Sequence, residues 1–291
     1  MIERREMGEG SAPGAAASRL APYRALFGAR FRMLLQYRAA ALGGLATQIA
    51  FGLILIMIYD AFYRSSTAAA QPMVFGQVAS YVWLGQALLM MLPWNVDSEM
   101  RAMMRSGGVV YELSRPVDLY TWWYARAAAQ RTAPVVLRAV PMLVFATLGL
   151  PRLGLGDWRL GPPASLSAGL GFAAAMVGAL AVACAMSVLL YIAWIWTLAA
   201  DGIVTVASTA VSMLSGLLIP LPLFPDWART VLRWLPFAGL LDQPARIYAG
   251  HIASGELAVV LARQLGWTAV LIALGRRLLA RGLRRVVVQG G

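Results

Sequence analysis

Two groups of polar side chains interrupt otherwise apolar stretches, and their spacing places each group on one helical face. The first group is Thr205, Ser208, Thr209, Ser212 and Ser215, at intervals of three or four residues. The second group is Gln77, Ser80 and Tyr81. These side chains could line a path for a solute, or they could bond the backbone of their own or a neighbouring helix. The spacing leaves both alternatives open.

Residues for covalent or metal chemistry are scarce. The chain contains no lysine, and its only histidine and cysteine are His251 and Cys184. Without lysine there is no Schiff base and no lysine of a phosphate-binding loop. A zinc site or a nucleophilic triad would also need residues that the chain hardly has. We therefore predict no catalytic residue, no metal site and no cofactor bound by this chain.

The composition is that of a membrane protein. Of the 291 residues, 60% are hydrophobic and 13% are charged, whereas soluble domains have about 25% charged residues. The mean hydropathy is +0.67. These values predict a chain that is largely embedded in lipid.

Apolar runs of about 20 residues, the length that crosses the hydrocarbon core, recur along the chain. The predicted spans are residues 39–59, 74–94, 133–150, 164–194, 203–223 and 257–275. Between Arg159 and Asp226 the only charge is Asp201, so two long or three shorter spans would fit that stretch. Arginines at both ends of the chain favour an even number of crossings. We predict an all-α polytopic fold with six transmembrane helices and both termini in the cytoplasm.

The arginines set the orientation. The predicted cytoplasmic segments are residues 1–38, 95–132 and 276–291, and they hold 17 of the 25 arginines, against 6 on the outside connections. The remaining predicted regions are spans one and two (39–94), spans three to five (133–223), an extracytoplasmic gate or re-entrant region (224–256) and span six (257–275). Because the basic charge follows topology, we expect no nucleic-acid binding.

The segment 1–38 lacks the apolar core of a cleavable signal peptide. Within it, Tyr23, Phe27, Phe31 and Leu34 recur at helical spacing, with arginines on other faces. This pattern predicts an amphipathic helix that lies in the lipid headgroup plane and leads into the first span.

The loop between the second and third spans contains a short apolar stretch. It follows the pair Gly107-Gly108 and is broken at Arg115-Pro116, because Pro116 disfavours helical geometry at the residue before it. Such a kinked element could dock into a groove of a soluble partner or lie on the membrane surface. The composition allows both.

The stretch after Gly216 cannot continue as a helix, because it contains Pro220, Pro222 and Pro225. Non-helical backbone at membrane depth must be buried in protein or face water. We therefore expect an outer lid or re-entrant segment here, with residues 228–235 as a short gate helix.

Two charges lie near or within apolar runs. Arg263 could meet an anionic solute or an acidic partner, or it could be paired structurally near a helix end. Asp201 is either a loop cap or an intramembrane acid.

Several segments resemble one transporter family. The run Gly107-Gly-Val-Val-Tyr-Glu-Leu-Ser-Arg-Pro-Val-Asp-Leu-Tyr120 is similar to the cytoplasmic segment of bacterial ABC transporter permeases of the type-two export class, particularly the drug and viologen export subfamily. The outer-gate region of that subfamily resembles the runs that begin at Ser215, Leu235 and Gln243, and its tail resembles Arg284 to Gly291. These segments occur in the same order along nearly the whole chain.

The resemblance implies six helices per subunit, a dimer with an identical or paralogous permease, and two cytoplasmic ATP-binding subunits that hold ATP and Mg²⁺. It implies that the coupling residues are Tyr111, Glu112, Leu113, Ser114, Arg115, Pro116, Val117 and Asp118. The implied outer gate is Pro220, Phe224, Pro225, Leu235, Pro236 and Phe237. A chain without lysine agrees with an ATPase on another polypeptide.

The sequence therefore predicts a multi-pass permease of a bacterial inner membrane, surrounded by lipid, that exports a hydrophobic or amphiphilic compound, as in multidrug efflux. The first alternative is an ion-coupled secondary transporter without an ATPase, which normally needs titratable groups within the membrane. A membrane-embedded transferase or protease would need a cluster of acids or histidines. A passive scaffold would tolerate deletion of residues 111–118.

Overall fold

The computed structural model describes residues 13–65, 71–197 and 200–284, and all regular structure in these ranges is helical. The α-helices are α1 (Pro13–Leu35), α2 (Arg38–Ser65), α3 (Phe75–Leu88), α4 (Ser98–Arg105), α5 (Val109–Leu113), α6 (Leu119–Val144), α7 (Leu150–Arg152), α8 (Leu166–Trp196), α9 (Ala200–Leu214), α10 (Asp226–Leu232), α11 (Asp242–Tyr248) and α12 (Leu257–Leu283). Short helices of other types are η1 (Leu89–Met91), η2 (Phe145–Gly149), η3 (Gly156–Trp158), η4 (Leu221–Leu223) and η5 (Ser254–Glu256). The beginning of the predicted N-terminal segment, residues 1–12, and the tail, 285–291, lie outside the described residues.

Four helices are long and apolar enough to cross a membrane. They are α2, the continuous helix of α6, η2 and α7, then α8 and α12, with lengths of 28, 34, 31 and 27 residues. At 1.5 Å per residue each exceeds the roughly 30 Å of a hydrocarbon core. These four helices agree with the first, third, fourth and sixth predicted spans.

The second and fifth predicted spans are shorter helices than the sequence indicated. Helix α3 has 14 residues and α9 has 15, and both give way to irregular backbone. Pro93 follows the short η1 after α3, and Gly216 with a φ of 87° follows α9. Six crossings therefore remain a prediction, in which these two spans would be completed by non-helical segments.

The third predicted span begins earlier than expected. Asp118 caps α6, because its carboxylate accepts a hydrogen bond from the Thr121 N–H at 2.9 Å. As a result residues 119–132, expected in a loop, continue helically into the span.

Helix α8 lies at the centre of the molecule. It is apolar on all sides, and 56% of its most apolar stretch of 18 residues is buried, as expected for a helix surrounded by protein. Small residues let α12 approach it closely: a side chain at Gly178 would collide with Gln264.

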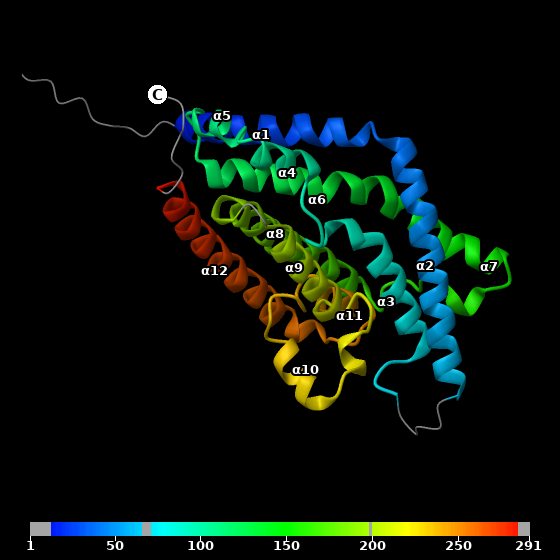
Figure 1. Cartoon of the computed structure of the whole chain (residues 1–291). Coiled ribbons are helices and arrows are strands. Elements are labelled where there is room, and N and C mark those ends of the chain that lie inside the picture. Colours follow the sequence, from blue (N-terminus) through cyan, green and yellow to red (C-terminus); the bar gives the residue numbers. More distant parts are fainter. Residues whose placement is uncertain (1–12, 66–70, 198–199, 285–291) are drawn as a thin grey trace, which may run out of the picture.

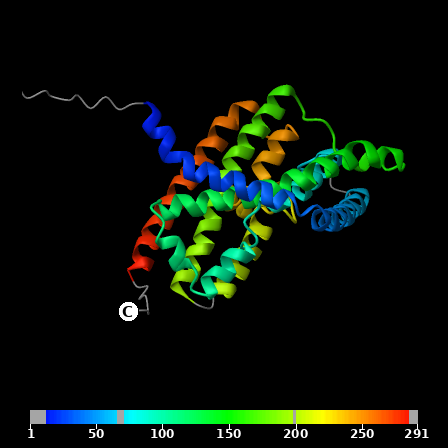
Figure 2. The same cartoon turned by 90° about the horizontal axis from the view of Figure 1, so that it is seen from above.

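The two ends of the molecule are formed by different helices. Helices α1, α4 and α5 lie at one end of the molecule, and α10 lies at the other (Figure 1). Helix α1 crosses over the bundle (Figure 2) and packs along α6. The end of α12 also lies at the α1 end, where Arg276 donates to Asp118 at 3.1 Å. Both described ends of the chain are therefore at one end of the bundle, as an even number of crossings requires.

Candidate functional site

The predicted coupling residues form an exposed rim at the α1 end. Helix α5 ends before Ser114, and the chain turns at Pro116. Tyr111 is 78% exposed, and Ser114, Arg115 and Pro116 are exposed as well. Leu113 and Val117 are half-buried beneath them. The rim can therefore be contacted from outside without any rearrangement.

Glu112 faces the opposite way and fixes the rim from below. Its buried carboxylate accepts hydrogen bonds from the indole N–H groups of Trp123 at 2.6 Å and Trp122 at 3.3 Å. Arg126 lies 3.7 Å away and supplies the balancing charge. A buried charge that is paired and hydrogen-bonded is held in one geometry.

Asp118 secures the other end of the rim. Besides capping α6, it accepts a hydrogen bond from Arg276 of α12, and its backbone N–H donates to the Tyr23 hydroxyl of α1 at 3.0 Å. The guanidinium of Arg115 stacks 5.0 Å above the Trp122 ring. Glu112, Arg115 and Asp118 thus tie the predicted coupling segment to α1, α6 and α12.

A cluster of charges that the sequence did not predict lies behind this rim. Asp97 is buried and binds Arg30 of α1 at 3.1 Å and Arg126 of α6 at 2.9 Å. Glu99 accepts a hydrogen bond from Arg30 at 2.6 Å and forms an ion pair with Arg126 at 3.2 Å. The hydrogen bond from Arg30 lowers the pKa of Glu99. The cluster joins α1, α4 and α6 through charge pairs; arginines inside an apolar helix are the signal that could have indicated it.

Arg131 forms hydrogen bonds with the irregular backbone that follows α3. It is fully buried in α6 and donates to the carbonyl oxygens of Leu92 at 2.9 Å and Asn95 at 2.5 Å, to the Asn95 side chain at 2.7 Å and to the Ser187 hydroxyl at 3.0 Å. These carbonyls follow the end of the helix and have no helical partner. Arg131 therefore makes a broken span compatible with burial.

Asp201 is neither a loop cap nor a fully buried acid. It lies in the first turn of α9, with 45% of its side chain exposed, and pairs with Arg105 of α4 at 2.6 Å. Arg101 is 3.7 Å away. The pair connects α9 to the helix that precedes the coupling rim.

The polar stripe of α9 is largely satisfied within its own helix. Four hydroxyls donate to the carbonyl four residues earlier, those of Thr205, Ser208, Thr209 and Ser212. The Ser208 hydroxyl also contacts the carbonyl of Trp94. Ser215 is buried, and its hydroxyl has no hydrogen-bond partner among the described residues. Thr205 and Thr209 are exposed, so a role on a solute path stays a prediction.

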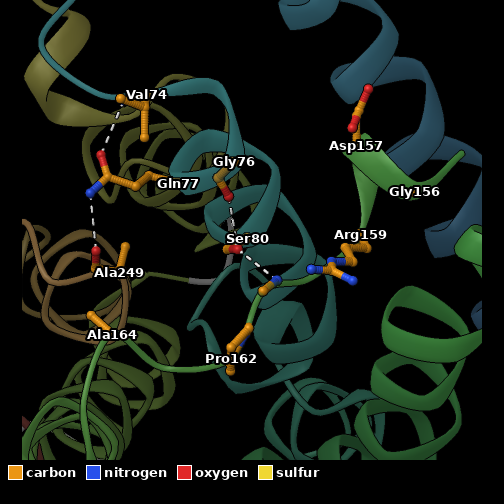
Figure 3. Close-up of a pocket in the computed structure, with 11 residues that line it drawn as sticks. Val74, Gly76, Gln77, Ser80, Gly156, Asp157, Arg159, Pro162, Ala164 and Ala249 are labelled. Carbon is orange, nitrogen blue, oxygen red and sulfur yellow. Dashed lines mark hydrogen bonds between the residues drawn. The ribbon is translucent and has the colours of Figure 1, made fainter.

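The polar residues of α3 point to other neighbours. Gln77 donates to the Ala249 carbonyl at 3.1 Å, and Ser80 accepts from the Gly161 N–H at 3.0 Å. Both line a cavity of about 600 Å³ between α3, the loop at η3 and the end of α11 (Figure 3). Asp157 and Arg159 are its charged residues. No residue of α9 lines this cavity, so the two predicted polar groups do not share it.

Tyr81 belongs to a third arrangement, next to the predicted gate residues. Its hydroxyl donates to the Asp242 carboxylate at 3.1 Å, and the Leu221 N–H donates to the same oxygen at 3.1 Å. Arg246 pairs with the other oxygen at 3.3 Å. Burial raises the pKa of Asp242. A side chain at Gly216 would collide with the Tyr81 hydroxyl. Asp242 thereby holds the segment after α9 against α3 and α11.

The predicted gate residues surround this point. They are Pro220, Phe224 and Pro225 near η4, and Leu235, Pro236 and Phe237 after α10. Phe224 and Leu235 pack against the small apolar cluster of Leu221, Ala228, Leu232 and Ala238. Arg263 stacks 4.2 Å above the Trp234 ring, which favours the structural alternative for this arginine.

A comparison with protein families identifies the chain. The model of the ABC-2 family transporter proteins matches residues 49–290, a range that includes the coupling rim and the gate. The chain belongs to the ABC-2 transporter family. Comparisons with curated proteins and with solved structures find no match. ABC-2 membrane proteins generally pair with an ATP-binding subunit, and the four apolar helices make this member a multi-pass membrane protein.

Proposed function

We propose that this chain is the membrane permease of an ABC exporter, driven by ATP hydrolysis on separate subunits. Two copies of a cytoplasmic ATP-binding subunit would bind the coupling rim, and a second permease, identical or paralogous, would complete the membrane part. ATP and Mg²⁺ would bind to the partner subunits, because a chain without lysine cannot supply a phosphate-loop lysine. The cargo would be a hydrophobic or amphiphilic compound, as in the drug and viologen export subfamily.

The observation that carries the proposal is the construction of the rim. Tyr111 and Arg115 are exposed, while Glu112 directly beneath them is buried between two indoles and an arginine. An exposed surface on a stiff base transmits the movement of a bound partner to the helices behind it. Through Asp97 and Arg126 that movement would reach α1 and α6, and through Asp201 it would reach α9.

Six crossings with both ends in the cytoplasm complete the proposal. In this topology the short helices α3 and α9 would both be crossings. The irregular backbone after α3 would be hydrogen-bonded by Arg131, and the irregular backbone after α9 by Asp242. The location of both described chain ends at the α1 end supports an even number.

The test is purification of the tagged chain from native membranes in mild detergent, followed by mass spectrometry and an ATPase assay. The variant Tyr111→Ala with Arg115→Ala should lose the ATP-binding subunit, since exposed tyrosine and arginine contacts each contribute about 2 kcal/mol at an interface centre. The matched control, Leu153→Ala with Arg152→Ala, alters an exposed apolar residue and an exposed arginine elsewhere. It should retain the subunit.

If no ATPase accompanies the wild-type chain, the proposal fails. The ion-coupled alternative would then be preferred, and the buried acid Asp242 would be the first group to test for proton coupling.

A further inference from the structure

Half of the arginines on the outer side of the proposed topology gather around one pocket. The outside connections carry Arg64, Arg152, Arg159, Arg229, Arg233 and Arg246. Basic residues are normally concentrated on the cytoplasmic side of membrane proteins. Three of these six nevertheless line the same pocket. The presence of three arginines in one pocket therefore needs an explanation in the structure around them.

The pocket lies between η4, α10 and α11, with a volume of about 260 Å³. It is lined by Leu221, Pro222, Asp226, Arg229, Thr230, Arg233, Arg246 and His251. A water molecule takes up about 30 Å³, so the space admits a phosphate group with a small substituent.

The acids near the pocket do not neutralise all of its arginines. Arg229 pairs with Asp226, and Arg246 pairs with Asp242. Arg233 forms no ion pair within the part of the chain that the structure describes. One unpaired positive charge therefore remains, on an exposed arginine that lines the pocket.

Arg246 also has an unsatisfied donor. Its Nε is buried and finds no hydrogen-bond acceptor among the described residues, although its Nη1 binds Asp242 at 3.3 Å. A buried donor without an acceptor costs about 1–3 kcal/mol. Because this Nε is shielded from solvent, an anion in the pocket would reach it only after a shift of the Arg246 side chain, which also lines the pocket.

His251 adds a neutral donor to the same wall. It is half-buried, and burial together with the nearby Arg246 lowers its pKa, which Glu256 opposes. The imidazole is therefore uncharged at neutral pH and can donate one N–H. The groups that face it are three arginines and Asp226 around the pocket and Glu256 beyond it.

We propose that this pocket, between α10 and α11, binds a phosphate-bearing anion, through the charge of Arg233, the guanidinium of Arg246 and the N–H of His251. The anion is a free phosphate compound or the headgroup of a lipid in the outer leaflet. Trp227 of α10 is 77% exposed, as expected for an indole at the level of lipid headgroups. The outward location of the pocket rests on the proposed function, but anion binding does not.

The experiment uses the single histidine of the chain as a reporter. The full-length chain, with isotope-labelled histidine, is purified in a maltoside detergent, which contains no phosphate. The pH titration of His251 is followed by NMR with added inorganic phosphate, with phosphatidylglycerol in mixed micelles, and with chloride at equal ionic strength. A bound anion stabilises the imidazolium, so the midpoint should rise by about one pH unit.

Variants separate a specific site from general electrostatics. Arg233→Gln should weaken the response about tenfold, as loss of one charged hydrogen bond predicts, and Arg233→Lys should retain most of it. Arg159→Gln, which removes an outer arginine at the other cavity, should respond as the wild type does. Response to phosphate alone identifies a soluble anion, and response to phosphatidylglycerol alone identifies a lipid headgroup.

The proposal is overturned if neither probe moves the midpoint beyond the chloride control. It is also overturned if Arg233→Gln responds as strongly as the wild type. Neither result depends on an ATP-binding subunit, so failure here is distinct from failure of the proposed function.

Discussion

The two ends of the molecule bury carboxylates in different ways. At the α1 end, Asp97 and Glu112 share Arg126, and Arg30 and two indoles complete the cluster. At the α10 end, Asp242 relies on a tyrosine hydroxyl, one backbone N–H and the guanidinium of Arg246. The cluster at the α1 end has several charges on four helices, whereas the one at the α10 end depends on a single acid.

This difference fits two mechanical roles. Breaking one pair of a buried charge network leaves other charges exposed to an apolar interior, so such a network moves as a unit. It also adjoins a large apolar cluster that includes Trp123 and Tyr191. The outer site adjoins a small cluster of one proline-rich turn and α10. On the proposed topology, we infer that the α1 end is built to transmit force and the α10 end to open.

The largest expected effect is that of Asp97→Ala. It leaves Arg30 and Arg126 without their main buried partner, which should cost about 3–5 kcal/mol of stability. Thermal unfolding of the purified chain in detergent measures this. Asp60→Ala, which removes an acid paired with an exposed arginine, should cost less than about 1 kcal/mol. A cost for Asp97→Ala no larger than that for Asp242→Ala would contradict the comparison.

Gly216→Ala should have the next largest effect. The residue has a φ of 87°, and an added methyl group would collide with the Tyr81 hydroxyl. Backbone strain and overpacking together should cost about 2–4 kcal/mol, and the gate should leak in a transport assay. Gly202→Ala is the control, since its added methyl meets nothing within 4 Å. Equal stability of the two variants would show that the outer gate is not held at Gly216.

A pH dependence distinguishes the outer acid. Burial raises the pKa of Asp242 above its ordinary value of 3.8. At a pH between the ordinary pKa of the unfolded state and the raised pKa of the folded state, folded Asp242 holds a proton that the unfolded chain has released. The free energy of unfolding should therefore fall as the pH rises through this window. The loss is about 1.4 kcal/mol for a one-unit difference. The melting temperature of Asp242→Asn should lack this slope. An identical slope in both proteins would assign it to another group.

The smallest effect concerns Glu99. The hydrogen bond from Arg30 lowers its pKa from the ordinary value of 4.5. Its stabilising contribution is therefore present above that value and is lost as the pH falls through the lower folded pKa. Because 59% of its side chain is exposed, the contribution should stay below about 1 kcal/mol. Melting curves of Glu99→Gln should diverge from the wild type only above this window; divergence in acid instead would refute the assignment.

The break points of the helices could be predicted from local sequence. Pro220, Pro222 and Pro225 indicated that no α-helix continues here, and this stretch holds only the short helix η4. Arg115-Pro116 indicated the end of the coupling element, and α5 ends just before it, at Leu113. The lengths of α3 and α9 could not be predicted, because an apolar run does not reveal where buried backbone leaves the helix.

The candidate site was predicted only in part. Sequence reasoning placed Arg126 and Arg131 in a cytoplasmic loop, whereas both are buried in α6. Their partners lie 29 and 36 positions away, at Asp97 and Asn95. Spacing within one helix carries no information about such pairs.

The sequence by itself determined the family, the helical class and the lack of lysine chemistry. These follow from composition and local pattern, which do not depend on how the helices pack. Only the tertiary structure decided which charged side chains are buried and which partners they contact. Tyr81 and Asp242 are 161 positions apart, and their contact exists because α3 and α11 pack side by side; the cost of burying a charge depends on that packing.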